Sequence, residues 1–335
     1  MLRVILLIIG GLTLGLLVWN IGPGHIYEAA SRLGPAALVV MLIPSLMMYV
    51  IEAYGWKITL GPSAQHIPFW HLFAIRMAGE VVNMTTPTAY VGGEPLKAYL
   101  LQRFRVPMVE ALASVVIAKT TMTIAQVLFI LVGVALAFWI LGAEGSSGQM
   151  VAATLLSLGL LLFGIAAFVF VQRHGIFTWI LQIVRKLGLR INFLESREEK
   201  LRSLDRTILD FYTHRHSAFY ASTGFFLLGW LAEAGEVFVI IYFLGGPAKF
   251  LSAVSIGALS VFIKGGTFFI PGSLGAQDAG NLFLLKAFGY SDVTGITFAL
   301  LRRFRELAWI GIGLLCFYFT DRNRRTIRSH RAGDQ

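Results

Sequence analysis

Charged residues are scarce in this chain of 335 residues, and cysteine is almost absent. Asp, Glu, Lys and Arg make up 14% of the sequence, whereas soluble domains contain about 25%. Hydrophobic residues account for 56%, and the mean hydropathy is +0.73. These proportions exclude an ordinary water-soluble fold and predict a protein embedded in a membrane.

Cysteine chemistry is excluded in the same way. The one cysteine, Cys316, lies in an apolar run, so we expect no internal disulfide, no metal site and no cofactor. The net charge of +10 would suggest nucleic acid as the partner of a soluble protein. Here the basic residues flank apolar segments, which favours membrane orientation and contact with anionic lipid over nucleic acid.

Long apolar runs are what the chain has in place of charge. A helix needs about 20 apolar residues to cross the hydrocarbon of a bilayer. Six runs qualify as full spans: 4–21, 35–60, 107–141, 151–171, 218–244 and 293–319. The first has the composition of a signal peptide, but no small-residue cleavage site follows it, so we expect a retained span.

Two further apolar segments, 68–101 and 251–288, are interrupted by glycine, proline and charge. The candidate turn residues are Pro87, Gly92 and Gly93 in the first and Pro271, Gly272 and Gly275 in the second. The charges include Arg76 and Glu80 in the first and Lys264 in the second. Because Gly and Pro break a helix, each segment is predicted to form two short helices, as a broken or re-entrant hairpin. A kinked span or a surface hairpin is the alternative.

The rare charges repeat at a fixed spacing. Four pairs of residues are each 184 positions apart: Glu52 and Glu236, Pro87 and Pro271, Glu94 and Asp278, and Lys119 and Arg303. Since a charge inside a bilayer costs about 2.5–3.5 kcal/mol on insertion scales, chance does not place them freely. We therefore predict two membrane repeats, 1–149 and 150–320, followed by a basic tail, 321–335.

The distribution of Lys and Arg predicts the orientation. Basic residues crowd the linker 173–215 and the tail, whereas 142–149 contains neither Lys nor Arg. Cytoplasmic segments are enriched in these residues, so both termini and the linker are expected in the cytoplasm. Threading the spans from there turns the second repeat upside down. The expected fold class is an all-α polytopic membrane protein with an inverted repeat.

The linker contains one amphipathic segment, 190–212. Its apolar residues recur at helical spacing: Leu194, Leu201, Leu204, Ile208 and Phe211. The opposite face is highly charged. We expect a helix on the cytoplasmic leaflet between the repeats, and the alternative is a docking site for a lipid-biosynthesis enzyme.

Both interrupted segments carry a motif. Residues 92–101 read Gly-Gly-Glu-Pro-Leu-Lys-Ala-Tyr-Leu-Leu, and residues 271–279 read Pro-Gly-Ser-Leu-Gly-Ala-Gln-Asp-Ala. They resemble the Gly-Gly-acid-x-x-basic-x-x-x-Leu and Pro-Gly-Gly-Leu-Gly-x-x-Glu-Ala elements of the flippase-like membrane domain. That domain is the transmembrane region of lysylphosphatidylglycerol synthases, and the chain is similar in size to stand-alone, hopanoid-associated members. Ser273 stands where the second Gly is usual, and Ala118-Lys119 where an acid–Arg pair is common.

The resemblance implies a lipid flippase or transporter of the bacterial cytoplasmic membrane. It would move a lipid with an anionic or polar head group by alternating access, with membrane lipids as partners. No enzyme activity is expected, because the aminoacyl-transferase part of larger members is not expected here. Two other classes stay open, namely a scaffold protein of a lipid pathway and an intramembrane lipid-modifying transferase.

The charges of the interrupted segments and the following spans form the candidate site. The predicted head-group residues are Glu94, Lys97, Lys119, Asp278, Arg302 and Arg303, around a central cavity. The alternatives are that the acids cap helices and that Lys119 and Arg303 neutralise them in static ion pairs. Glu52 and Glu236 lie in the middle of spans and are candidates for proton coupling or for bonds to neighbouring helices.

Overall fold

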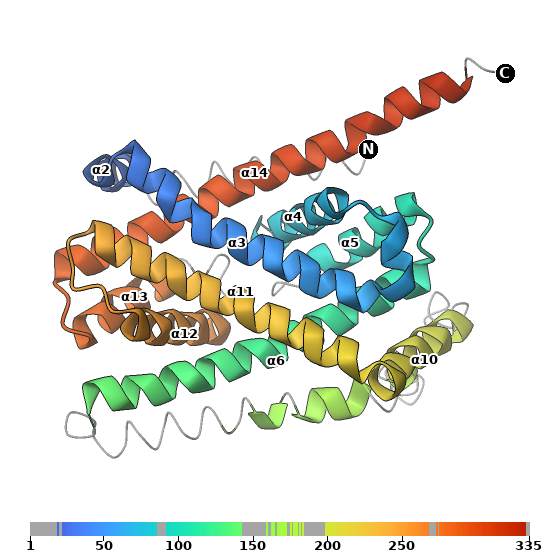
Figure 1. Ribbon diagram of the computed structural model, residues 1–335, viewed down its shortest axis with the longest axis horizontal. Helices are drawn as coiled ribbons and strands as arrows, with labels where there is room; N and C mark the ends of the chain where they lie inside the picture. Colours follow the sequence, from blue (N-terminus) through green and yellow to red (C-terminus); the bar gives the residue numbers. More distant parts are fainter. Residues whose placement is uncertain are drawn as a thin grey trace.

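The computed structural model describes residues 22–85, 92–142, 198–267 and 275–332. It also describes residues 19, 273, 159, 162–164, 166–172, 175, 177–179, 181 and 183. Over these residues the chain is helical and contains no β-strand (Figure 1). Most of the predicted span 4–21 and part of 151–171 lie outside the described residues, as do Pro87, Pro271 and Gly272.

Three long helices match predicted spans. They are α3 (Pro35–Leu60), α6 (Met108–Leu141) and α11 (His216–Phe243). Within the described residues, these are the helices long and apolar enough to cross a bilayer, α3 being counted there together with the short 3₁₀ helix η1 (Gly61–His66). The predicted span 293–319 forms part of α14 (Asp292–Ala332). No Gly or Pro occurs between residues 314 and 332, so α14 continues through most of the segment predicted as a separate tail.

Each interrupted segment forms two helices, as its Gly and Pro residues predicted. The first gives α4 (Phe69–Thr85) and α5 (Gly93–Leu101), and η2 (Gln102–Phe104) follows the segment. The second gives α12 (Phe250–Gly266) and α13 (Ala276–Ala287). At the start of α5, the Gly93 N–H donates to Asn83 Oδ1 of α4 over 2.7 Å. A Cβ at position 93 would lie 1.9 Å from the Gly79 carbonyl oxygen, so this close crossing requires glycine.

The centre of the bundle is an antiparallel pair of helices, α3 and α11 (Figure 1). The Ser222 hydroxyl, early in α11, donates to the Gly55 carbonyl, late in α3, over 3.0 Å. Further along the crossing, Gly229 lies against Glu52. The small residues let the two backbones approach closely, as is common where helices pack in a membrane.

The other helices surround this pair in matched positions. Helix α6 packs on α12, and α14 packs on α4. Helix α5 contacts α4 and α6, and α13 contacts α12 and α14. Glycines mark both long crossings, since a Cβ on Gly133 would meet Ala258 of α12, and one on Gly313 would meet Val81 of α4. The helices that follow α3 therefore have the same order as those that follow α11, and the contacts named here correspond between the two sets.

Two helices differ from the sequence-based expectation. Residues 22–34, between the predicted spans 4–21 and 35–60, where the sequence predicts no helix, contain α2 (Pro23–Leu33), which begins at a proline and ends before Gly34, whose φ is 78°. Helix α10 (Glu198–His214) forms in the amphipathic linker. Its apolar stripe does not face a membrane leaflet, because Leu204 and Ile208 pack against α6 in one buried cluster. Packing on a protein surface removes the same apolar area from water as lipid would.

Candidate functional site

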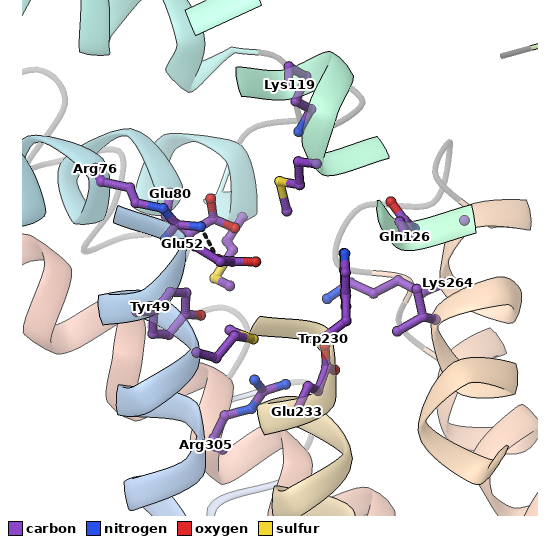
Figure 2. A pocket seen from close by; sticks show the side chains of 15 residues that line it. Tyr49, Glu52, Arg76, Glu80, Lys119, Gln126, Trp230, Glu233, Lys264 and Arg305 are labelled. Carbon is purple, nitrogen blue, oxygen red and sulfur yellow. Dashed lines mark hydrogen bonds and ion pairs between the residues drawn. The ribbon is translucent and has the colours of Figure 1, made fainter. Parts of the chain in front are cut away.

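A cavity of about 270 Å³ lies in the centre of the bundle, between α3, α4 and α6 from the first half of the chain and α11, α12 and α14 from the second (Figure 2). Its wall combines charge with apolar and aromatic side chains. The lining residues are Met48, Tyr49, Glu52, Arg76, Glu80, Met84, Lys119, Met122, Gln126, Trp230, Glu233, Val261, Lys264, Gly265 and Arg305.

Helices α3 and α4 supply one charged wall. Arg76 of α4 forms an ion pair and hydrogen bond with Glu52 of α3, and both side chains are buried. The Arg76 guanidinium also lies over the ring of Tyr49, 5.4 Å from its centroid. Glu80 follows Arg76 by one helical turn, which places both side chains toward the cavity (Figure 2).

A smaller hollow of about 30 Å³ continues from the cavity toward α5. Arg76, Glu80 and Lys119 line both spaces. In the smaller hollow, Glu94 of α5 lies 3.0 Å from the Lys97 ammonium and 3.9 Å from the Lys119 ammonium. Glu94 also accepts a hydrogen bond from Asn83 over 3.2 Å. The first motif therefore brings its acid, its base and the base of the next span together.

The second motif forms the corresponding cluster between α13 and α14. Arg303 Nε donates to Asp278 Oδ1 over 2.9 Å, and its terminal nitrogen donates to Asp278 Oδ2 over 3.0 Å. Arg303 also donates to Glu306 over 2.7 Å and to the Ser273 carbonyl over 3.2 Å. Glu306 in turn lies 3.3 Å from Lys264, which lines the cavity. This chain of contacts connects the second motif with the cavity.

Four charged residues lie between α11 and α14. Arg302 pairs with Glu233 and donates to the Ser260 hydroxyl over 3.2 Å. Glu236, with a side chain that is 0% exposed, lies 3.3 Å from Arg305 and 3.9 Å from Arg302. The buried carboxylate is held by guanidinium groups because an unpaired charge at this depth would be strongly destabilising.

We call the charged residues that line either space, or that are joined to them by ion pairs, the ionic network. Its carboxylates are Glu52, Glu80, Glu94, Glu233, Glu236, Asp278 and Glu306. Its cationic side chains are Arg76, Lys97, Lys119, Lys264, Arg302, Arg303 and Arg305. The arrangement suits a polar group that exchanges partners with several fixed charges.

The predicted head-group residues all belong to this network but differ in position. Lys119 lines the cavity, and Glu94 and Lys97 line the smaller hollow. Asp278, Arg302 and Arg303 join the network through ion pairs and line neither space.

The alternative roles predicted from the sequence, helix capping and static ion pairing, are also seen in this structure. Asp278 accepts a hydrogen bond from the Gly275 N–H over 3.0 Å, so it caps α13 as well as pairing with Arg303. Lys119 and Arg303 each pair with the acid 25 residues earlier in the chain. The proton-coupling candidates Glu52 and Glu236 are likewise held by arginines. Of the predicted turn residues that are described, Gly92 and Gly93 start α5 and Gly275 precedes α13.

Sequence reasoning assigned no role to Glu80, Lys264 or Glu306. A signal for two of them was present, because Glu80 and Lys264 are 184 residues apart and so occupy corresponding positions in the predicted repeat. Their opposite charges hid the correspondence. Tyr49 and Trp230 lie in apolar spans and gave no signal, since aromatic residues are ordinary in such a setting.

The backbone conformation of Ser273 explains why glycine is usual at this position of the motif. It has a φ of 47°, in the left-handed region that glycine adopts without strain. The glycine usual at this position therefore fits the backbone, and Ser273 keeps the same conformation.

Comparison with known proteins agrees with the motifs. Residues 3–314 match the family model described as the lysylphosphatidylglycerol synthase TM region. A UPF0104 membrane protein of Methanothermobacter thermautotrophicus is 26% identical over 305 residues, which cover 87% of this chain and 86% of that protein. No solved structure matches the chain. Because the family match spans nearly the whole sequence, the protein belongs to the lysylphosphatidylglycerol synthase transmembrane-region family.

Proposed function

We propose that this protein is a transporter that moves a lipid with an anionic or polar head group across the membrane. The observation that carries the proposal is the central cavity, which three helices of each half line with charged side chains. In the proposal the head group enters the cavity and the acyl chains stay in the surrounding hydrocarbon. Methionines and an indole in the wall give the glycerol region an apolar surface to pass.

The arrangement of helices supports an inverted repeat. The positions of α3, α4, α5 and α6, shifted by 184 residues, fall within three residues of the starts of α11, α12, α13 and α14. The antiparallel crossing of α3 and α11 and the matched neighbours of the other helices are what two inverted copies would produce. Transporters built in this way place the substrate at the interface of the copies and expose it to each side in turn.

The cationic side chains of the cavity support an anionic or polar head group as substrate. Lys119, Lys264 and Arg305 line the cavity, and Lys and Arg bind phosphate oxygens through charge-assisted hydrogen bonds. In the proposed orientation the basic linker and the end of α14 lie in the cytoplasm. The charged face of α10 stays a candidate docking surface for an enzyme of lipid biosynthesis, since its apolar face is covered.

Lipid movement in liposomes tests the proposal. Purified protein is reconstituted with a fluorescent phospholipid, and the rate at which label becomes protected from an impermeant quencher is measured. Wild-type protein should move label faster than empty liposomes. Lys119→Gln and Lys264→Gln should each slow it about tenfold or more, because a hydrogen bond to a charged group contributes about 1.5–3 kcal/mol.

Lys286→Gln is the matched control, since Lys286 forms an exposed ion pair with Asp292 outside the cavity. Its rate should equal that of the wild type. Equal rates for wild type and empty liposomes across phospholipid, polyprenyl-phosphate and glycolipid probes would refute the transport function.

A further inference from the structure

Among the residues that the structure describes, the ionic network contains equal numbers of acidic and basic side chains, seven of each. The connections between α4 and α5 and between α12 and α13, residues 86–92 and 267–275, contain no Asp, Glu, Lys or Arg. The network is therefore formally neutral before a head group enters. A head group with a negative charge would make the filled cavity negative by the same amount.

A net charge in this setting is costly. Removing an ion from water costs several kcal/mol even after the protein relaxes, and a bilayer surrounds the bundle with hydrocarbon. A neutral network with a zwitterionic head group stays neutral. A neutral network with an anionic head group needs a compensating positive charge during the crossing.

Glu80 is the group placed to take that charge. The carboxylates that line the two spaces are Glu52, Glu80, Glu94 and Glu233. Three of them form ion pairs. Glu52 pairs with Arg76, Glu94 pairs with Lys97 and Lys119, and Glu233 pairs with Arg302. In the part of the chain that the structure describes, Glu80 lines both spaces and forms no ion pair.

The surroundings of Glu80 make its charge depend on what the cavity holds. The charged or titratable groups that face it are Tyr49, Glu52, Arg76, Glu94, Lys97, Lys119, Glu233, Lys264 and Arg305. In the empty cavity the cations among them favour a charged carboxylate. A phosphate that binds Lys119 and Lys264 takes those cations and adds a negative charge nearby. A carboxylate in this position would then bind a proton from water and release it, with the lipid, on the other side.

We propose that an anionic lipid crosses together with one proton carried by Glu80, so that each crossing is electroneutral. The position that corresponds to Glu80 in the second half is Lys264, which is not a carboxylate. The two corresponding positions therefore provide one carboxylate, and one proton is carried per crossing. The inference rests on the proposed transport function. It adds an energy source for the crossing, namely the proton gradient.

The test compares two gradients on wild-type protein in liposomes containing a labelled phosphatidylglycerol. A pH gradient of one unit at zero membrane potential should shift the steady-state distribution of label between leaflets about tenfold, since one proton accompanies each lipid. A membrane potential of about 60 mV would shift a lipid that crosses with an uncompensated charge about tenfold. Without a pH gradient, this potential should leave the distribution of label unchanged. A zwitterionic labelled lipid should respond to neither gradient.

Glu80→Gln identifies the proton carrier. Whatever its rate of lipid movement, its steady-state distribution of label should no longer respond to the pH gradient and should respond to the potential. Glu110→Gln is the control, since Glu110 is exposed and bonds Ser63 outside the network. A wild-type response to the potential alone, or to a sodium gradient, would overturn the inference while leaving lipid transport intact. Wild-type liposomes that move no lipid would instead refute the transport function itself.

Discussion

The two halves of the chain hold the same ion pair in different ways. In the second half, Arg303 is 5% exposed and is bound by Asp278, Glu306 and a backbone carbonyl. In the first half, Lys119 is 36% exposed, faces the cavity and lies 3.9 Å from Glu94. The corresponding cations are therefore locked on one side and accessible on the other.

This difference is what alternating access requires of one conformation. If two inverted copies are chemically similar, the side that is open and the side that is closed must differ in packing. The fork of Arg303 suits a closed cluster with fixed geometry, whereas the single ammonium of Lys119 suits exchange between Glu94 and a head group. In the proposed transport cycle, the α4–α5–α6 side is the open one in this structure.

The largest effect is expected at the buried carboxylate of the second half. Glu236→Ala leaves Arg305 without its acidic partner and should lower the free energy of unfolding by about 3–5 kcal/mol. Thermal unfolding in detergent measures the change. Glu110→Ala, at an exposed position, should unfold like the wild type, and equal stability of both variants would show that Glu236 contributes no essential pairing.

The locked ion pair should contribute more to structure than the accessible one. Arg303→Gln removes charged hydrogen bonds to Asp278 and Glu306, each contributing about 1.5–3 kcal/mol, and should speed hydrogen exchange in α13. Lys119→Gln should leave exchange in α5 nearly unchanged while slowing lipid movement. Equal acceleration in the two variants would mean that both pairs are static.

The crossing of α14 with α4 should tolerate no added methyl group. In Gly313→Ala the new Cβ would lie 2.4 Å from Val81 Cγ2, and overpacking of this kind costs about 1–3 kcal/mol. Gly311 lies two residues earlier in α14, and a Cβ added there would meet no atom within 4 Å, so Gly311→Ala should be neutral or stabilising. Thermal unfolding of the two variants measures the contrast, and identical shifts would contradict the close packing of the two helices.

The smallest effect is expected outside the membrane bundle. Arg202 forms an i,i+4 ion pair with Glu198 on α10, and its side chain is 59% exposed. Arg202→Gln should change the free energy of unfolding by about 0.5 kcal/mol or less. Chemical denaturation measures this change. A loss comparable to that of Glu236→Ala would mean that the exposed and buried pairs are equivalent.

Much of the fold could be predicted from the sequence because hydrocarbon constrains it strongly. Apolar length gave α3, α6 and α11 nearly to the residue, and Gly and Pro gave the division into α4 and α5 and into α12 and α13. Helix α2 was missed because its residues are too few and too polar to signal a span. The cover over the α10 stripe was missed because an apolar face does not reveal what it packs against.

The candidate site was predicted in part, for a related reason. Rarity of charge and the 184-residue spacing singled out Glu94, Lys119, Asp278 and Arg303, which do form pairs. The same spacing could not reveal Glu80 and Lys264 by identity of charge, because the two residues have opposite charges. Nor can spacing show which cations line a cavity and which are enclosed, since that depends on the conformation.

Linking the two halves covalently tests most directly whether lipid crosses by their relative movement. Thr121 of α6 and Ser222 of α11 have hydroxyl oxygens 3.0 Å apart, so Thr121→Cys with Ser222→Cys places two thiols within reach of a disulfide. Cys316→Ala removes the native thiol. We predict that lipid movement in liposomes stops on oxidation, returns on reduction and is unaffected in either single-cysteine variant. Oxidised, fully cross-linked protein that moves lipid as fast as the protein with its disulfide reduced would contradict the account.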